Sequence, residues 1–133
     1  MTLNDLSQLY YLNREIKMDQ ERLEALRARA SSPSGLNLTG IPSGGSFENM
    51  LERYIAEIVD LENIIRTKRK KCMDERNSLE RYIAEIPDSL TRQIFTLRFV
   101  EGLSWHNVAF GVGGGNTADS VRMICRRYIE QNN

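Results

Sequence analysis

The stretch FENMLERYIAEIVDLENIIRTKRKKCMDERNSLERYIAEI, residues 47–86, decides the fold of this chain. It contains neither glycine nor proline, and it carries two columns of residues spaced seven apart, as in a coiled-coil helix. One column comprises Leu51, Ile58, Ile65, Cys72, Leu79 and Ile86, and the other Phe47, Tyr54, Leu61, Lys68, Glu75 and Tyr82. The pattern predicts a helix about 60 Å long, with Ser46 as its N-cap and Pro87 as its end.

A second periodic segment, residues 3–30, precedes this stretch. The apolar residues of this segment are spaced three and four apart, with Asp19 as an interruption: Leu9, Leu12, Ile16, Leu23, Leu26 and Ala30. Residues 31–46, which connect the two segments, are uncharged and rich in Gly, Pro and Ser. A long helix with one apolar seam needs a partner, so we expect residues 3–30 to fold back antiparallel onto residues 47–73. A parallel dimeric coiled coil is the alternative, and the polar positions Lys68 and Glu75 are of a type that sets register and partner number.

Two further features lie within the long predicted helix. The octapeptide Leu-Glu-Arg-Tyr-Ile-Ala-Glu-Ile occurs at residues 51–58 and again at 79–86, four heptads apart. Duplication of a good helical sequence is the favoured interpretation, and a repeated partner-binding face is the alternative. Residues 66–71, Arg-Thr-Lys-Arg-Lys-Lys, form a basic run that we interpret as solvated helix surface rather than as an auxiliary phosphate contact.

Composition excludes several classes of protein. The 133 residues carry 18 basic and 18 acidic side chains, which argues against a polycation that coats nucleic acid. No apolar run is long enough for a membrane span, the N-terminus lacks the pattern of a secretory signal, and two distant cysteines make no disulfide framework. With His106 as the single histidine and a glycine-rich stretch that lacks the lysine of a P-loop, we expect no enzyme, no metal site and no cofactor.

The last part of the chain, residues 88–131, predicts three short helices. Asp88 or Ser89 caps the first, with Leu90, Ile94, Leu97 and Val100 as its apolar positions, and Gly102 ends it. Ser104 caps the second, in which Trp105, Val108 and Ala109 are candidates for burial. A turn at residues 111–116 suits positive φ angles, and Thr117 caps the third. The buried stripe of the third helix is predicted to comprise Val121, Ile124, Cys125 and Tyr128.

This order of elements is typical of a helix-turn-helix whose third helix enters the major groove of DNA. The small side chains of its first turn allow close approach to base edges, and its arginines suit guanine or phosphate. The candidate DNA-binding residues are Ser104, His106, Thr117, Ala118, Asp119, Ser120, Arg122, Met123, Arg126 and Arg127. An ordinary three-helix packing unit with arginines on its wet face is the alternative.

Residues 88–131 resemble region four, the C-terminal DNA-binding region, of bacterial sigma factors. The resemblance lies in Leu97-Arg98-Phe99, Glu101-Gly102-Leu103-Ser104, Val108-Ala109 and Ser120-Val121-Arg122. The stretch from Gly113 to Val121 is similar to a variant in short phage and prophage proteins of Gram-positive bacteria, which also begin with helical arms and a Gly/Ser-rich linker. The spacing of 12 from Ala109 to Val121 exceeds the usual spacing of about ten, so the turn is longer here.

We therefore expect an all-α protein with four parts: an N-terminal amphipathic helix (1–30), a linker (31–46), a long heptad helix (47–86) and a sigma-like helix-turn-helix domain (87–133). The resemblance implies sequence-specific binding of double-stranded DNA in phage or prophage transcription. The alternatives are a small terminase-type DNA-packaging subunit and an adaptor that contacts RNA polymerase. A homo-oligomer, with a dimer favoured, and a location in the bacterial cytoplasm complete these expectations.

Overall fold

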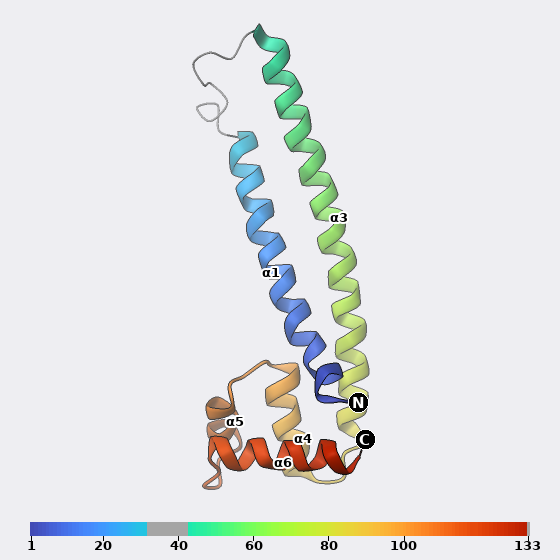
Figure 1. Cartoon of the computed structure of the whole chain (residues 1–133), viewed down its shortest axis with the longest axis vertical. Helices are drawn as coiled ribbons and strands as arrows, with labels where there is room; N and C mark the ends of the chain where they lie inside the picture. Colours follow the sequence, from blue (N-terminus) through green and yellow to red (C-terminus); the bar gives the residue numbers. More distant parts are fainter. Residues whose placement is uncertain (32–42, 133) are drawn as a thin grey trace. The chain divides into compact units, whose positions relative to one another are not determined.

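The computed structural model describes residues 1–31 and 43–132, with side chains from residue 48 onward in the second range, and every regular element in these ranges is helical. The elements are α1 (Leu3–Ser31), α3 (Ser43–Ala84), α4 (Ser89–Phe95), the π-helical turn η1 (Thr96–Val100), α5 (Trp105–Val112) and α6 (Ala118–Gln131) (Figure 1). The predicted all-α class is confirmed. No helix of the described residues is long and apolar enough to cross a membrane.

The long helix α3 begins earlier than the heptads indicated. It starts at Ser43, four residues ahead of the expected start at Phe47, so the last residues of the expected linker are helical. Most of that linker lies outside the described residues, as do the side chains of Ser46 and Phe47. The other predicted end agrees closely, because α3 ends at Ala84 and Pro87 follows.

The helices divide into two compact units, the first comprising Met1–Asn13 with Lys71–Asn133 and the second comprising Arg14–Lys70. In the second unit, parts of α1 and α3 run antiparallel. The ion pair of Arg27 with Glu62 and that of Asp19 with Lys68 show this direction, because residue numbers rise along one helix as they fall along the other. Within this unit the expected intrachain hairpin forms, and it provides a partner for the apolar seam.

Two of the three polar interruptions of the apolar seams, Asp19 and Lys68, meet in this second unit. The Lys68 ammonium lies 2.6 Å from an Asp19 carboxylate oxygen and 3.1 Å from a Glu15 carboxylate oxygen. Hydrogen bonds to Asp19 and then Glu15 raise the pKa of Lys68 above its ordinary value. The Asp19 side chain is only 13% exposed, so this pair fixes the register of the hairpin at the cost of removing a carboxylate from water. The apolar side chains buried in this unit are Ile16, Leu23, Leu26, Leu61 and Ile65.

The first unit has one hydrophobic core to which both ends of the chain contribute. Leu6 and Leu9 of α1 belong to it, as do Leu79 and Ile83 of α3 and Ile86, which follows the end of α3. The three C-terminal helices supply Ile94, Phe95, Phe99, Val108, Ala109, Val121, Cys125 and Ile129. The predicted domain boundary at residue 87 therefore does not separate two cores, because the last turns of α3 are buried together with the helices that follow.

The apolar face of the α4 helix differs from the predicted stripe. Ile94 is buried as expected, but the expected Leu90, Leu97 and Val100 are half-buried. Phe95 and Phe99 take the central places, with their ring centroids 5.3 Å apart. Phe95 lies in α4, ahead of the π-helical turn η1, and Phe99 follows it at a spacing of four, so the two rings share one face.

Candidate nucleic-acid interface

The connection from α5 to α6 is a glycine turn, and a capping box of hydrogen bonds follows it at the N-terminus of α6. Gly113, Gly114 and Gly115 have φ angles of 65°, 66° and 76°, a region that side chains other than glycine rarely adopt. The Thr117 hydroxyl accepts a bond from the Ser120 amide at 3.1 Å, and the Ser120 hydroxyl accepts one from the Thr117 amide at 2.9 Å. This capping box confirms the predicted N-cap and sets where α6 begins.

Helix α6 has one face in the core and one in solvent. Val121 and Cys125 of the predicted stripe are buried, whereas Ile124 and Tyr128 are half-buried against the core. Ile129 is buried as well, although the predicted stripe omitted it. The candidate DNA-binding residues of the first turn are exposed or half-buried, and those further along are exposed: Thr117, Ala118, Asp119, Ser120, Arg122, Met123, Arg126 and Arg127.

Two arginines on the exposed face are held in pairs along the helix. A guanidinium nitrogen of Arg122 lies 3.5 Å from a carboxylate oxygen of Asp119, and Arg126 Nε lies 3.2 Å from a carboxylate oxygen of Glu130. All four side chains are more than half exposed. Such pairs contribute little to stability in water, so an incoming anion can replace either carboxylate at small cost.

The start of α5 lies against the η1 turn. Ser104 is the N-cap, as predicted, and its hydroxyl accepts a bond from the Asn107 amide at 3.2 Å. Trp105 is half-buried, and the Arg98 guanidinium lies 4.5 Å from its ring centroid. Arg98 Nη1 also donates to the Leu103 carbonyl at 2.8 Å. The neighbouring His106 is exposed, so Ser104 and His106 lie together at the beginning of this helix.

A groove of about 560 Å³ runs beside α6 within the first unit. Arg122 and Arg126 line it together with Arg98 and Trp105, and the first turns of α1 contribute Leu3, Ser7 and Tyr11. Arg98 and Tyr11 were not among the predicted site residues. No local pattern marks them, because they reach the groove only through the packing of α1 and η1.

The remaining chemical groups include a buried thiol and the basic run of α3. Burial raises the pKa of the Cys125 thiol to about 12, so this thiol is a poor nucleophile. The described residues hold no cluster of three or more His, Cys, Asp or Glu placed to bind a metal ion. In the basic run, Lys68 is engaged by Asp19, and Arg66 donates to the Asn63 side chain at 2.9 Å.

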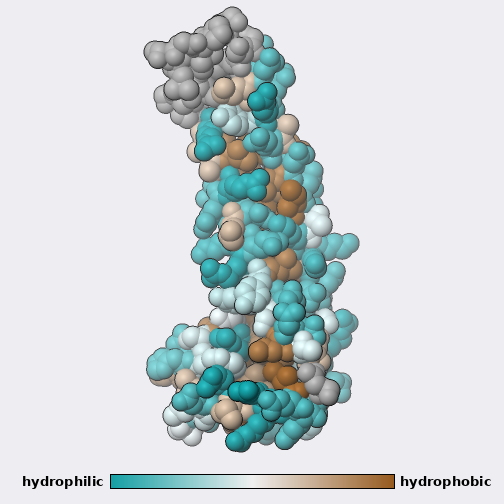
Figure 2. Space-filling view, in the orientation of Figure 1, coloured by the Kyte–Doolittle hydropathy of each residue, from teal (hydrophilic) through white to brown (hydrophobic). Residues whose placement is uncertain are grey.

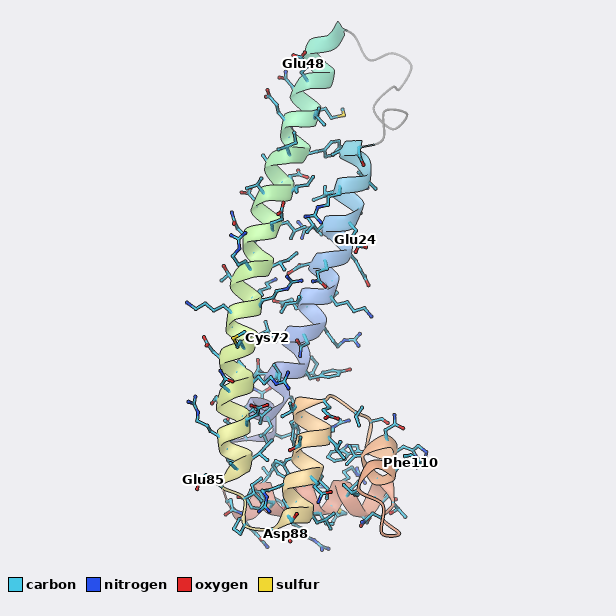
Figure 3. The ribbon with its side chains drawn as sticks, turned by 180° about the vertical axis from the view of Figure 1, so that it is seen from behind. Glu24, Glu48, Cys72, Glu85, Asp88 and Phe110 are labelled. Carbon is cyan, nitrogen blue, oxygen red and sulfur yellow. The ribbon has the colours of Figure 1, made fainter. Side chains whose placement is uncertain are left out.

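One apolar side chain on α5 stands out from its surroundings. Phe110 is 88% exposed, and Figure 3 shows its ring directed away from the helix. Hydrophilic side chains cover much of the surface seen in Figure 2, with hydrophobic ones in separate patches between them. An aromatic ring that none of the described residues covers is a feature of protein contact surfaces.

The chain was compared with protein-family models, with curated proteins and with solved structures, and none of the three comparisons found a match.

Proposed function

We propose that α5, the glycine turn and α6 form a helix-turn-helix that binds double-stranded DNA, with α6 as the recognition helix. The observation that carries this proposal is the exposed face of α6, where Arg122, Arg126 and Arg127 project from a helix whose opposite face is anchored in the core. The packing of α5 against α6 supports it, because the first helix of such a motif must hold the second at a set angle.

The residues have distinct roles in this proposal. Arg122 lies nearest the start of α6; its ion pair with Asp119 breaks, and its guanidinium then binds a base edge. Arg126 and Arg127, one turn further on, contact phosphates. Ser104 and His106 at the start of α5 contact the backbone on the same side, where the helix N-terminus favours an anion. The sigma-like motifs of the sequence lead us to place this DNA binding in phage or prophage transcription.

A matched pair of triple variants tests the DNA-binding surface. Double-stranded fragments of the genome that encodes the chain are selected with the intact protein, and affinity for a selected duplex is measured by fluorescence anisotropy. The variant R122A/R126A/R127A removes three exposed cations from α6, and R69A/K70A/K71A removes three exposed cations from the basic run. We expect the first variant to lose binding by at least about a hundredfold, and the second to change it only a few-fold.

The individual contributions are also separable. R122A alone should cost about 1–3 kcal/mol and relax sequence preference at one position, whereas R126A or R127A should lower the log–log salt slope by about one. Promoter-containing fragments support a regulator, and enrichment of one packaging site favours the terminase-type alternative. The proposal is wrong if the basic-run variant abolishes binding while the α6 variant binds normally, or if no duplex is retained.

Phe110 favours a second candidate function, that of an adaptor which binds another protein, such as an RNA polymerase subunit. Its exposed ring is the kind of aromatic anchor that protein interfaces bury. If the adaptor role is the correct one, Phe110→Ala will abolish binding to immobilised RNA polymerase while the α6 arginine variant still binds it. Retention of polymerase by the Phe110 variant at the wild-type level would remove this candidate.

A further inference from the structure

The groove beside α6 combines cations, hydroxyls and apolar side chains from four elements of the first unit. Its cations are Arg98, Arg122 and Arg126, and Glu130 is the one acidic side chain that lines it. Since Glu130 is paired with Arg126, the groove carries an excess of positive charge. An anionic occupant therefore fits it better than a neutral or cationic one.

Arg98 is held in place before any ligand arrives. Its guanidinium is stacked on Trp105 and bonded to the Leu103 carbonyl, which leaves further N–H donors for a ligand. Arg98 itself lies in the π-helical turn η1, and such turns occur often at functional sites. Because less side-chain freedom is lost on binding, a pre-oriented arginine binds an anion at lower entropic cost than a free one.

The first turns of α1 complete the wall of the groove. Leu3 and Tyr11 are 55% and 61% exposed, and the Ser7 hydroxyl belongs to the same lining. A second hollow of about 440 Å³ shares Ser7, Tyr11 and Arg98 with the groove and extends to Gly102. At Gly102, with φ of 72°, a Cβ atom would lie 3.3 Å from the Tyr10 ring, so glycine permits the close approach of α1 here.

A DNA strand has the chemistry that this lining complements, because anionic phosphates alternate along it with apolar faces of deoxyribose. We infer that the groove holds the sugar–phosphate backbone of one strand of the bound duplex, which makes the first three turns of α1 part of the DNA-binding surface. The arginines take the phosphates, the Tyr11 hydroxyl donates to them, and Leu3 packs on a sugar. This inference rests on the proposed function, since Arg122 and Arg126 belong to both surfaces.

Two exposed positions on α1 provide a matched test. Tyr11 lines the groove, whereas Met18, 68% exposed, lies on the same helix within the second unit. Tyr11→Glu and Met18→Glu add the same charge to exposed helical sites, so neither is expected to disturb folding. With the selected duplex, we expect Tyr11→Glu to weaken binding about tenfold or more through repulsion of phosphate, and Met18→Glu to change it less than about twofold.

Conservative variants refine this result. Tyr11→Phe removes only the hydroxyl and should weaken binding less than Tyr11→Ala. Glu130→Gln removes the acidic group of the groove and frees Arg126 for phosphate, so it should strengthen binding a few-fold, with a steeper dependence on salt. A single strand of the selected duplex serves as the competitor that distinguishes backbone binding in a duplex from binding of an unpaired strand.

The outcomes separate this inference from the proposed function. If Tyr11→Glu behaves like Met18→Glu while R122A/R126A/R127A loses the duplex, DNA binding stands and the groove inference is overturned. Tyr11-dependent binding that prefers the single strand also overturns it. If the intact protein retains no duplex, the inference and the proposed function both fail.

Discussion

The repeated octapeptide offers a stability experiment with its own internal control. Ile83 and Ile55 occupy the same position in the two copies, yet Ile83 is 6% exposed and Ile55 is 51% exposed. Each isoleucine has the same four residues before it and the same three after it. Both truncations therefore change an identical local sequence, and the difference in helix propensity between the interior of α3 at Ile55 and its last turn at Ile83 stays within a few tenths of a kcal/mol.

The expected magnitudes follow from burial. Ile83→Ala removes methyl groups from a packed core and leaves a cavity, which costs about 2–5 kcal/mol. Ile55 keeps half of its surface in water, so Ile55→Ala loses only part of the transfer free energy and leaves no enclosed cavity, at a cost of about 1 kcal/mol or less. We expect the two variants to differ by about 2–3 kcal/mol in the free energy of unfolding.

Urea denaturation measures this difference. Far-ultraviolet circular dichroism reports helix content, and fluorescence of the single tryptophan, Trp105, reports the unit that contains Ile83. Each curve is repeated at tenfold lower protein concentration, because self-association through Ile55 would make its apparent stability depend on concentration. Equal losses for Ile83→Ala and Ile55→Ala at both concentrations would refute the assignment of the second copy to the core.

Two further predictions concern titratable groups. Lys68→Met should cost about 1–3 kcal/mol at pH 7, because the Asp19 carboxylate is left without its cation in a mostly buried position. The pKa of Lys68 is raised in the folded chain, so the difference from wild type should be full at neutral pH and shrink above pH 10.5; a pH-independent difference would contradict this. Burial raises the pKa of the Cys125 thiol to about 12, so only about a thousandth of it is ionised at pH 9. Iodoacetamide should therefore alkylate Cys72 first and Cys125 only on unfolding, which mass spectrometry would show. Equal rates in the folded protein would disprove the burial of Cys125.

Features that depend on near neighbours in the chain were predictable from the sequence. Ser104 and Thr117 cap their helices through bonds to amides three residues on, so the residue types at short spacing carry the information. For the same reason Asp88 could be named as one of two caps; its carboxylate accepts bonds from the Thr91 hydroxyl and amide, which lower its pKa. The heptads likewise predicted the seam of the hairpin.

Features that depend on distant packing were not predictable in this way. Phe95 and Phe99 were missed because the stripe of Leu90, Ile94 and Leu97 is equally regular in the sequence, and only packing against the other helices decides which face is buried. Asp19 and Lys68 were recognised as interruptions of two separate seams, but not as partners. The arginines of α6 were found because they alternate with a buried stripe on one helix, whereas Tyr11 enters the groove from the far end of the chain.

The core of the first unit is discontinuous in sequence, and this has a consequence for the order of folding. On the ribosome, residues 1–13 are made before residues 71–133 and lack these partners until then. Closing such a long loop is entropically costly for a flexible chain. The hairpin of residues 14–70 depends on contacts between residues closer in sequence, so it can form earlier and bring the two flanking segments together. These segments meet where the Cys72 thiol lies 3.0 Å from the Asn13 side-chain oxygen. Substitutions that weaken the hairpin of residues 14–70 should therefore slow the folding of the C-terminal helices, although the substituted residues make no contact with those helices.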